Sequence, residues 1–75
     1  MEIRTALMTK NDMFALVSMA ITDDEASITT VDPRRKEPLV KTYEPWLASS
    51  EYKKVVRLSV RNGWRVIYDG QPLWG

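Results

Sequence analysis

The sequence contains neither cysteine nor histidine, and this restricts how a chain of 75 residues can fold. A domain of this size buries only about 60% of the surface that it exposes when unfolded, so many such domains rely on disulfides or a structural metal. Disulfide bonds and ordinary zinc sites are both excluded here. The core must come from the hydrophobic residues, which are 44% of the chain, or from a partner. We expect one compact domain over residues 1–75, with a protein partner or a second copy of the chain.

The lack of cysteine and histidine also excludes several kinds of catalytic site. A cysteine nucleophile, a Ser–His pair and an imidazole proton shuttle are all excluded. Gly63, Gly70 and Gly75 lie at turns or at the end of the chain, so they form no glycine-rich phosphate loop. The acidic residues 23–25 lack the alternating spacing of a calcium loop and are typical of a solvated turn. We therefore predict no enzyme activity, no metal site and no cofactor.

The first residues and the longest apolar stretch of the sequence predict the cellular location of the protein. Residues 1–4 do not begin a secretory signal, which needs a basic segment followed by an apolar run. Residues 13–21 are too few to span a bilayer, which takes about 20 apolar residues. We expect a cytoplasmic protein with no membrane association.

Charge and aromatic residues are unevenly distributed. Residues 1–32 contain two basic and six acidic residues, whereas residues 33–65 contain nine basic and three acidic ones. Every aromatic residue except Phe14 lies at position 43 or later. This asymmetry predicts an oriented surface if the fold keeps the two halves apart.

The first half predicts a three-stranded meander. Residues 2–8 alternate, residues 13–21 are apolar on both faces, and residues 27–31 are β-branched, which is typical of strands. A buried helix is the alternative for residues 13–21. Residues 39–43 are expected to form a short strand, and Pro45 is expected to begin a helix over residues 46–54.

Asn62-Gly63 is the strongest turn signal in the sequence. The runs before and after it alternate, which predicts a type I′ hairpin. The alternative is a helix from Glu51 with Lys53, Arg57 and Arg61 as a basic stripe, ended by Asn62-Gly63. We favour the hairpin because valine and serine are poor helix formers. The predicted fold is α+β, a small antiparallel sheet made of the meander and this C-terminal hairpin with one short helix. A small β-barrel is the alternative.

Two surfaces emerge as candidate binding sites. In the hairpin, Arg57, Arg61, Trp64 and Tyr68 would share one face, where rings stack bases and guanidinium groups meet phosphates. The alternative for this face is a set of cation–π pairs on a solvated sheet. Arg34, Arg35 and Lys36 form a basic loop that would contact a phosphate backbone or an acidic protein surface.

The C-terminal residues Leu73 and Trp74 are a third candidate, as an apolar anchor for a partner. Two functions follow from these features. The first is a small protein-binding regulator or inhibitor, of the kind that phages and mobile elements encode to act on a host factor. The second is a nucleic-acid-binding module that uses the hairpin face and the basic loop.

Overall fold

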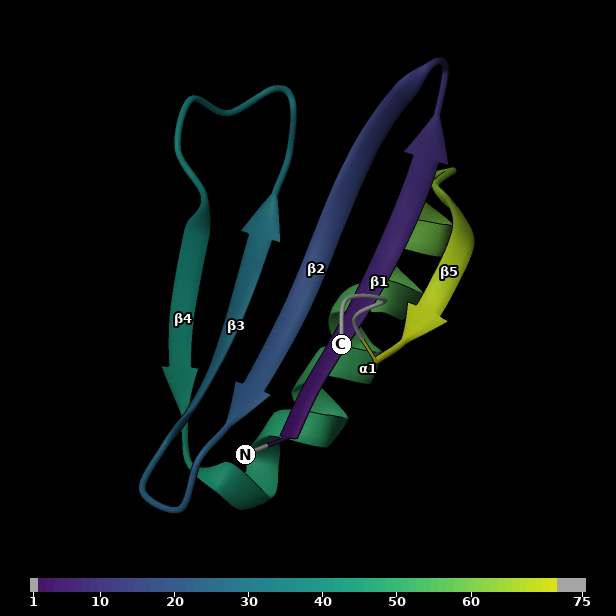
Figure 1. Cartoon of the computed structure of the whole chain (residues 1–75). Coiled ribbons are helices and arrows are strands. Elements are labelled where there is room, and N and C mark those ends of the chain that lie inside the picture. The colour runs from purple at the N-terminus through teal and green to yellow at the C-terminus, as the bar shows by residue number, and fades with distance from the viewer. Residues whose placement is uncertain (1, 72–75) are drawn as a thin grey trace.

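The computed structural model describes residues 2–71 and shows an antiparallel sheet with a helix packed against one side (Figure 1). In chain order, the elements are β1 (Glu2–Lys10), β2 (Met13–Ile21), β3 (Ala26–Val31), β4 (Leu39–Tyr43), α1 (Pro45–Arg61) and β5 (Arg65–Gly70). The order across the sheet is β4-β3-β2-β1-β5, so β4 and β5 form its two edges. The α+β class is confirmed, and the sheet does not close into the alternative barrel.

The N-terminal meander is confirmed. β1 and β2 pair along their full lengths, from Glu2 opposite Ile21 to Lys10 opposite Met13. Asn11 and Asp12 connect them, and both have positive φ, as the central residues of a type I′ hairpin turn do. β2 then pairs with β3, and β3 pairs with β4. Residues 13–21 are therefore a strand and not a buried helix.

The core lies between the sheet and α1. Alternate residues of β1, β2 and β3 point toward the helix, and small residues such as Ala6, Ala15 and Ala48 allow the helix to approach closely. Tyr52 is 1% exposed and is one of the largest fully buried side chains. The buried hydrophobic residues are Ala6, Met8, Ala15, Val17, Met19, Ala26, Ile28, Ala48, Tyr52 and Trp64.

The predicted Asn62-Gly63 hairpin is wrong, because α1 continues through Arg61. Pro45 begins the helix as expected, but Ala48, Tyr52, Val55 and Val56 form a stripe that packs on the sheet along most of its length. Burial of this stripe outweighs the weak helix propensity of valine and serine.

Asn62-Gly63 instead ends the helix, as the alternative interpretation had it. The Asn62 N–H donates to the carbonyls of Leu58 and Ser59, and Gly63 has a φ of +97°. Glycine after the last helical residue commonly takes this left-handed conformation. The chain then turns into β5, which pairs with β1 across a bulge opposite Leu7 and Met8.

Within residues 2–71, no helix has the length and apolar character that crossing a membrane requires. Every buried side-chain nitrogen or oxygen in this part of the chain has a hydrogen-bond partner. The described fold therefore satisfies its polar groups internally.

Candidate functional site

Within residues 2–71, the sheet has one face covered by α1 and one face that no other helix or strand covers, which we call the open face (Figure 1). The strand register assigns alternate residues to it, because cross-strand partners share a face. From β1 to β4, these residues are Ile3, Thr5, Leu7, Thr9, Phe14, Leu16, Ser18, Ala20, Ser27, Thr29, Val31, Val40 and Thr42. None of these positions on β1–β4 carries a charge, whereas on the edge strand β5 the exposed Arg65 is the cross-strand partner of Thr9 and brings one charge to the margin of the open face.

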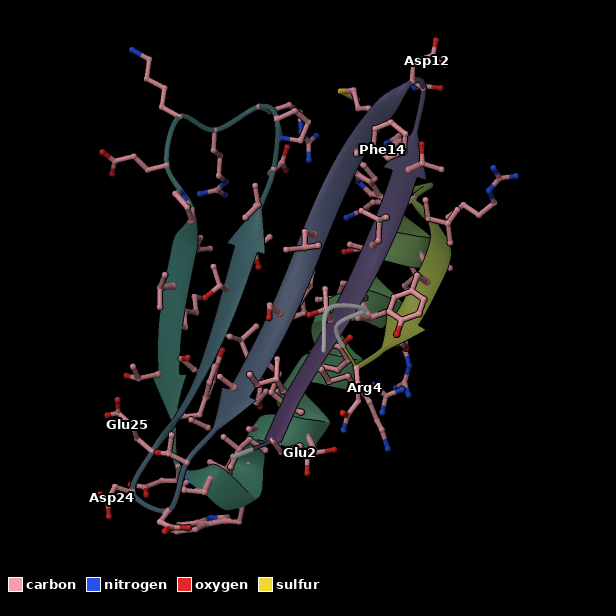
Figure 2. All side chains as sticks on the ribbon, viewed as in Figure 1. Glu2, Arg4, Asp12, Phe14, Asp24 and Glu25 are labelled. Carbon is pink, nitrogen blue, oxygen red and sulfur yellow. The ribbon has the colours of Figure 1, made fainter. Side chains whose placement is uncertain are left out.

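An apolar band crosses the open face at right angles to the strands. Tyr68 of β5, Leu7 of β1, Leu16 of β2 and Val31 of β3 are successive cross-strand partners. Phe14 lies beside this band and is 60% exposed, and Figure 2 shows its ring standing on the side of the sheet away from α1. The band and Phe14 together form a contiguous apolar surface.

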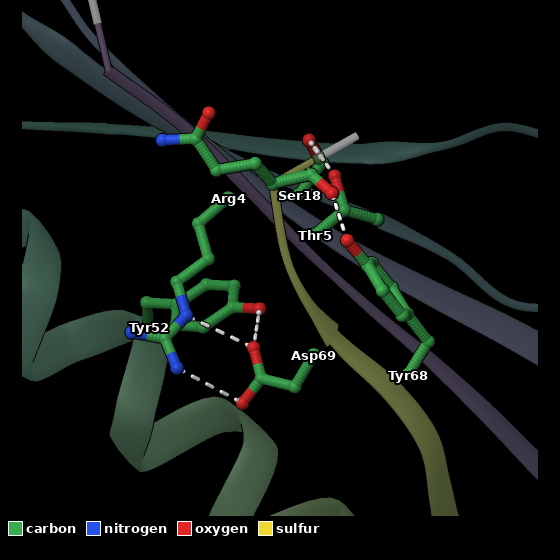
Figure 3. A network of polar contacts seen from close by, with 7 residues as sticks. Arg4, Thr5, Ser18, Tyr52, Tyr68 and Asp69 are labelled. Atoms are coloured by element: carbon green, nitrogen blue, oxygen red, sulfur yellow. Dashed lines mark hydrogen bonds and ion pairs between the residues drawn. The ribbon is translucent and has the colours of Figure 1, made fainter. Parts of the chain in front are cut away.

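Hydroxyl groups occupy the neighbouring part of the open face. Thr5, Ser18 and Thr29 are cross-strand partners in the next row, and Ser27 and Thr42 pair in the row after it. The Oγ1 of Thr5 lies 3.3 Å from the Oγ of Ser18, so these two hydroxyls share a hydrogen bond (Figure 3). These rows can donate and accept hydrogen bonds without bringing a net charge.

The charged residues of β1 lie on the other side of the sheet. Glu2, Arg4 and Lys10 all occupy even positions, which face α1. Lys10 donates through its Nζ to the Asn62 carbonyl at 2.6 Å, at the C-terminal end of the helix. β1 therefore places its charges on the covered side of the sheet.

Arg4 belongs to a polar network that ties β1, α1 and β5 together (Figure 3). Its Nε donates to Asp69 Oδ1 at 2.9 Å, and the Tyr52 hydroxyl donates to the same oxygen at 2.8 Å. The hydrogen bond from Arg4 lowers the pKa of Asp69. Burial, and then the hydrogen bond to Asp69, raise the pKa of Tyr52 well above its usual range. This network fixes the helix to the sheet.

The predicted hairpin face is not assembled. Arg57 and Arg61 lie on the exposed side of α1, whereas Trp64 is only 6% exposed and belongs to the core. Tyr68 belongs to the apolar band of the open face, and its hydroxyl donates to the Gln71 carbonyl. The four residues therefore lie in three separate parts of the molecule: the outward side of α1, the core and the open face.

The basic loop is partly engaged inside the molecule. Asp32 accepts hydrogen bonds from the backbone N–H of Arg34 at 2.9 Å and from its Nη2 at 2.7 Å. These bonds lower the pKa of Asp32 to about 2. The Arg34 guanidinium also lies 5.8 Å from the centre of the Trp64 ring. Arg34 thus holds the loop in place, while Arg35 and Lys36 are exposed. Leu73 and Trp74 lie outside the described residues.

The outward side of α1 presents a separate basic stripe. Trp46, Lys53, Arg57 and Arg61 are spaced by seven, four and four residues, which places them along one side of the helix. Trp46 is 76% exposed at the N-terminal end of this stripe. The neighbouring Lys54 pairs with Glu51 at 3.4 Å. The stripe matches the basic stripe of the helical alternative for this segment.

Sequence reasoning missed the open face. Its signal was present in β1, where Ile3, Thr5, Leu7 and Thr9 alternate with residues that include all the charges of the strand. A second signal was that β2 is apolar on both faces, which requires cover on both sides.

In the part of the chain that the structure describes, no cluster of three or more acidic, cysteine or histidine side chains is placed to hold a metal ion. No protein-family model matches the chain, and no curated protein or solved structure shows significant similarity to it.

Proposed function

We propose that the chain is a protein-binding module, a small regulator or inhibitor that engages its partner with the open face of the sheet. The observation that carries this proposal is the lack of charge on that face in β1–β4, in a chain whose residues are 28% charged. Protein interfaces are depleted of charged residues at their centres, and contiguous apolar patches mark interaction sites.

The composition of the open face suits a protein surface. The apolar band supplies contact area, and Phe14 supplies an exposed aromatic side chain of the type that anchors interfaces. The hydroxyl rows can satisfy backbone groups of a partner, at a lower desolvation cost than ionised groups would carry. A partner on this face would also stabilise the fold, since binding to the native state alone raises stability.

Photocrosslinking in cells that express the protein tests this proposal. A photoreactive phenylalanine analogue at Phe14 would lie on the open face, and the same analogue at Trp46 would lie on the outward side of α1 as a control of similar exposure. We expect covalent adducts to protein from position 14 and few from position 46. Protein adducts from position 46 alone, or none from either position, would contradict the proposal.

A second function, nucleic-acid binding, is favoured by one specific observation. Trp46, Lys53, Arg57 and Arg61 combine an exposed ring with three cations along one side of α1. Cations of this kind bind phosphates, and the ring offers a stacking surface. This proposal moves the nucleic-acid site from the expected hairpin to the helix.

Oligonucleotide binding over a range of salt concentrations tests the second function. The double variant Arg57→Glu with Arg61→Glu should abolish binding and its salt dependence. Arg35→Glu with Lys36→Glu changes the net charge equally in the basic loop and should have a smaller effect. Equal losses in both double variants would indicate a general charge effect and no site on the helix.

A further inference from the structure

We infer that the open face binds a second copy of this chain, so that two sheets pack face to face in a symmetric dimer. The inference rests on the proposed function, because it names the occupant of the same protein-binding face. The resulting assembly would have four layers, with a helix outside each sheet. Such packing gives a small domain a second covering layer, which no helix or strand within residues 2–71 provides.

The arrangement of the open face is compatible with self-association. In a twofold dimer the same patch serves both partners, so every residue near the axis meets its own copy. A charged residue there would face an identical charge, but the open-face positions of β1–β4 carry none, and Arg65 of β5 lies at one edge of the sheet. A partner other than a second copy of the chain would not require the centre of the face to be free of charge.

The apolar band also suits a twofold axis. Tyr68, Leu7, Leu16 and Val31 run in a line across four strands. A twofold axis along this line, or along the strands through its middle, places the band of one copy on the band of the other. Sheets that pack face to face lie about 10 Å apart, with side chains of the two inner faces interdigitated.

The size of the open face fits a stable dimer. The longest strands, β1 and β2, have nine residues each. The other three strands have five or six residues, so at about 3.4 Å per residue and about 4.8 Å between strands the face measures about 570 Å². Standard protein interfaces bury about 800 Å² on each partner. Two such faces together exceed the total of about 1,000 Å² that a specific interface needs, although each is smaller than the standard.

The outward side of α1 is the less favourable self-contact. Lys53, Arg57 and Arg61 would approach their own copies in a helix-to-helix dimer. Like charges in an interface oppose association. This repulsion favours the sheet over the helix as the surface between copies.

Sedimentation and light scattering of the full chain over a range of concentrations test the inference. Val31 and Leu47 are both 43% exposed, the first in the apolar band and the second on α1, so Val31→Lys and Leu47→Lys are matched variants. We expect a dimer for the unmodified chain and for Leu47→Lys. Val31→Lys should dissociate at least ten-fold more readily. Circular dichroism would establish that both variants remain folded.

An isotope-filtered NMR experiment on the unmodified chain tests the interface directly. Mixing labelled and unlabelled copies should give intermolecular contacts between the methyl groups of Leu7, Leu16 and Val31 and none from Leu47. Intermolecular contacts confined to α1, or a dimer lost only in Leu47→Lys, would overturn the inference.

The two proposals fail in different ways. A chain that stays monomeric at every concentration, yet forms adducts to another protein from position 14, overturns the second copy and leaves protein binding by the open face intact. A monomeric chain with no protein adduct from position 14 overturns both.

Discussion

Residues that face α1 and residues that face away from it alternate along the same strands, and α1 covers only the first group. In β1, Ala6 and Met8 are fully buried under the helix, while Leu7 between them is half-buried on the open face. In β2, Val17 is fully buried, while Phe14 on the other side is 60% exposed. The two faces of the sheet thus differ more in how far they are buried than in how many apolar residues they carry.

The placement of charge separates the two faces further. An antiparallel sheet with one solvated face usually has hydrophobic residues inward and polar residues outward. Here Glu2, Arg4, Lys10 and Lys41 lie on the side that faces α1, at its margins, and the outward side of β1–β4 is apolar or hydroxyl-bearing. This reversal of the usual pattern is the basis of our proposal that the open face contacts a protein.

The largest expected effect comes from the centre of the covered face. Tyr52→Ala should lower the free energy of unfolding by about 3–5 kcal/mol, because it leaves a cavity between α1 and the sheet. Phe14→Ala on the open face should lower it by less than about 1 kcal/mol in the monomer, since its ring is largely exposed. Urea unfolding at low protein concentration, followed by circular dichroism, measures both.

Equal destabilisation by these two variants would break the comparison. It would mean that Phe14 already belongs to a second core within the monomer. The open face would then need no partner.

The next effect concerns the point where α1 ends. Gly63 has a φ of +97°, and a side chain there would lie 3.3 Å from the Lys10 Cε. Gly63→Val should destabilise the fold by about 1–3 kcal/mol, because a β-branched residue is strained at positive φ. Gly63→Asn should cost less, since asparagine tolerates this conformation. Thermal unfolding compares the two, and a harmless Gly63→Val would contradict the helix end described here.

The sequence predicted the elements that local patterns determine. The meander, the strand at residues 39–43 and the helix start at Pro45 follow from alternation, β-branched residues and proline geometry. The segment from Val55 to Arg61 was misjudged because alternation and helical periodicity both fit it. Tertiary burial of Tyr52, Val55 and Val56 decided between them, and no local pattern contains that information.

The candidate site was predicted less well, for a related reason. The hairpin error placed Arg57, Arg61, Trp64 and Tyr68 on one face, whereas only Tyr68 lies on the open face. The open face needs the register of five strands, including β5, which joins β1 from the far end of the sequence. A one-residue change in that register would reverse which side chains it presents.

A smaller effect, with a pH dependence, tests the network at the margin of the covered face. Tyr52→Phe removes the hydrogen bond to Asp69 and should cost about 1 kcal/mol at neutral pH. Because the fold raises the pKa of Tyr52, its contribution is complete below about pH 10, the pKa of an unfolded tyrosine, and falls as the pH rises above it. Unfolding measured between neutral and strongly alkaline pH should therefore show a steeper decline for the unmodified chain than for Tyr52→Phe. Parallel curves would contradict this role of Tyr52.

The smallest effect on monomer stability is expected at the open face, and there it is paired with a large effect on association. Val40 lies on the outward side of the edge strand β4 and is 57% exposed, so Val40→Thr keeps its shape and should change the free energy of unfolding by less than about 0.5 kcal/mol. Phe14→Ser should also leave the monomer folded, because little of its ring is buried.

The two variants should differ in their effect on association. Phe14→Ser removes a large apolar ring from the contact surface, whereas Val40→Thr only exchanges a methyl group for a hydroxyl. Association measured by sedimentation should therefore weaken strongly in Phe14→Ser and only slightly in Val40→Thr. Unchanged association in Phe14→Ser would move the contact away from the apolar band, toward the hydroxyl rows, where Thr29→Lys would then be the variant that disrupts it.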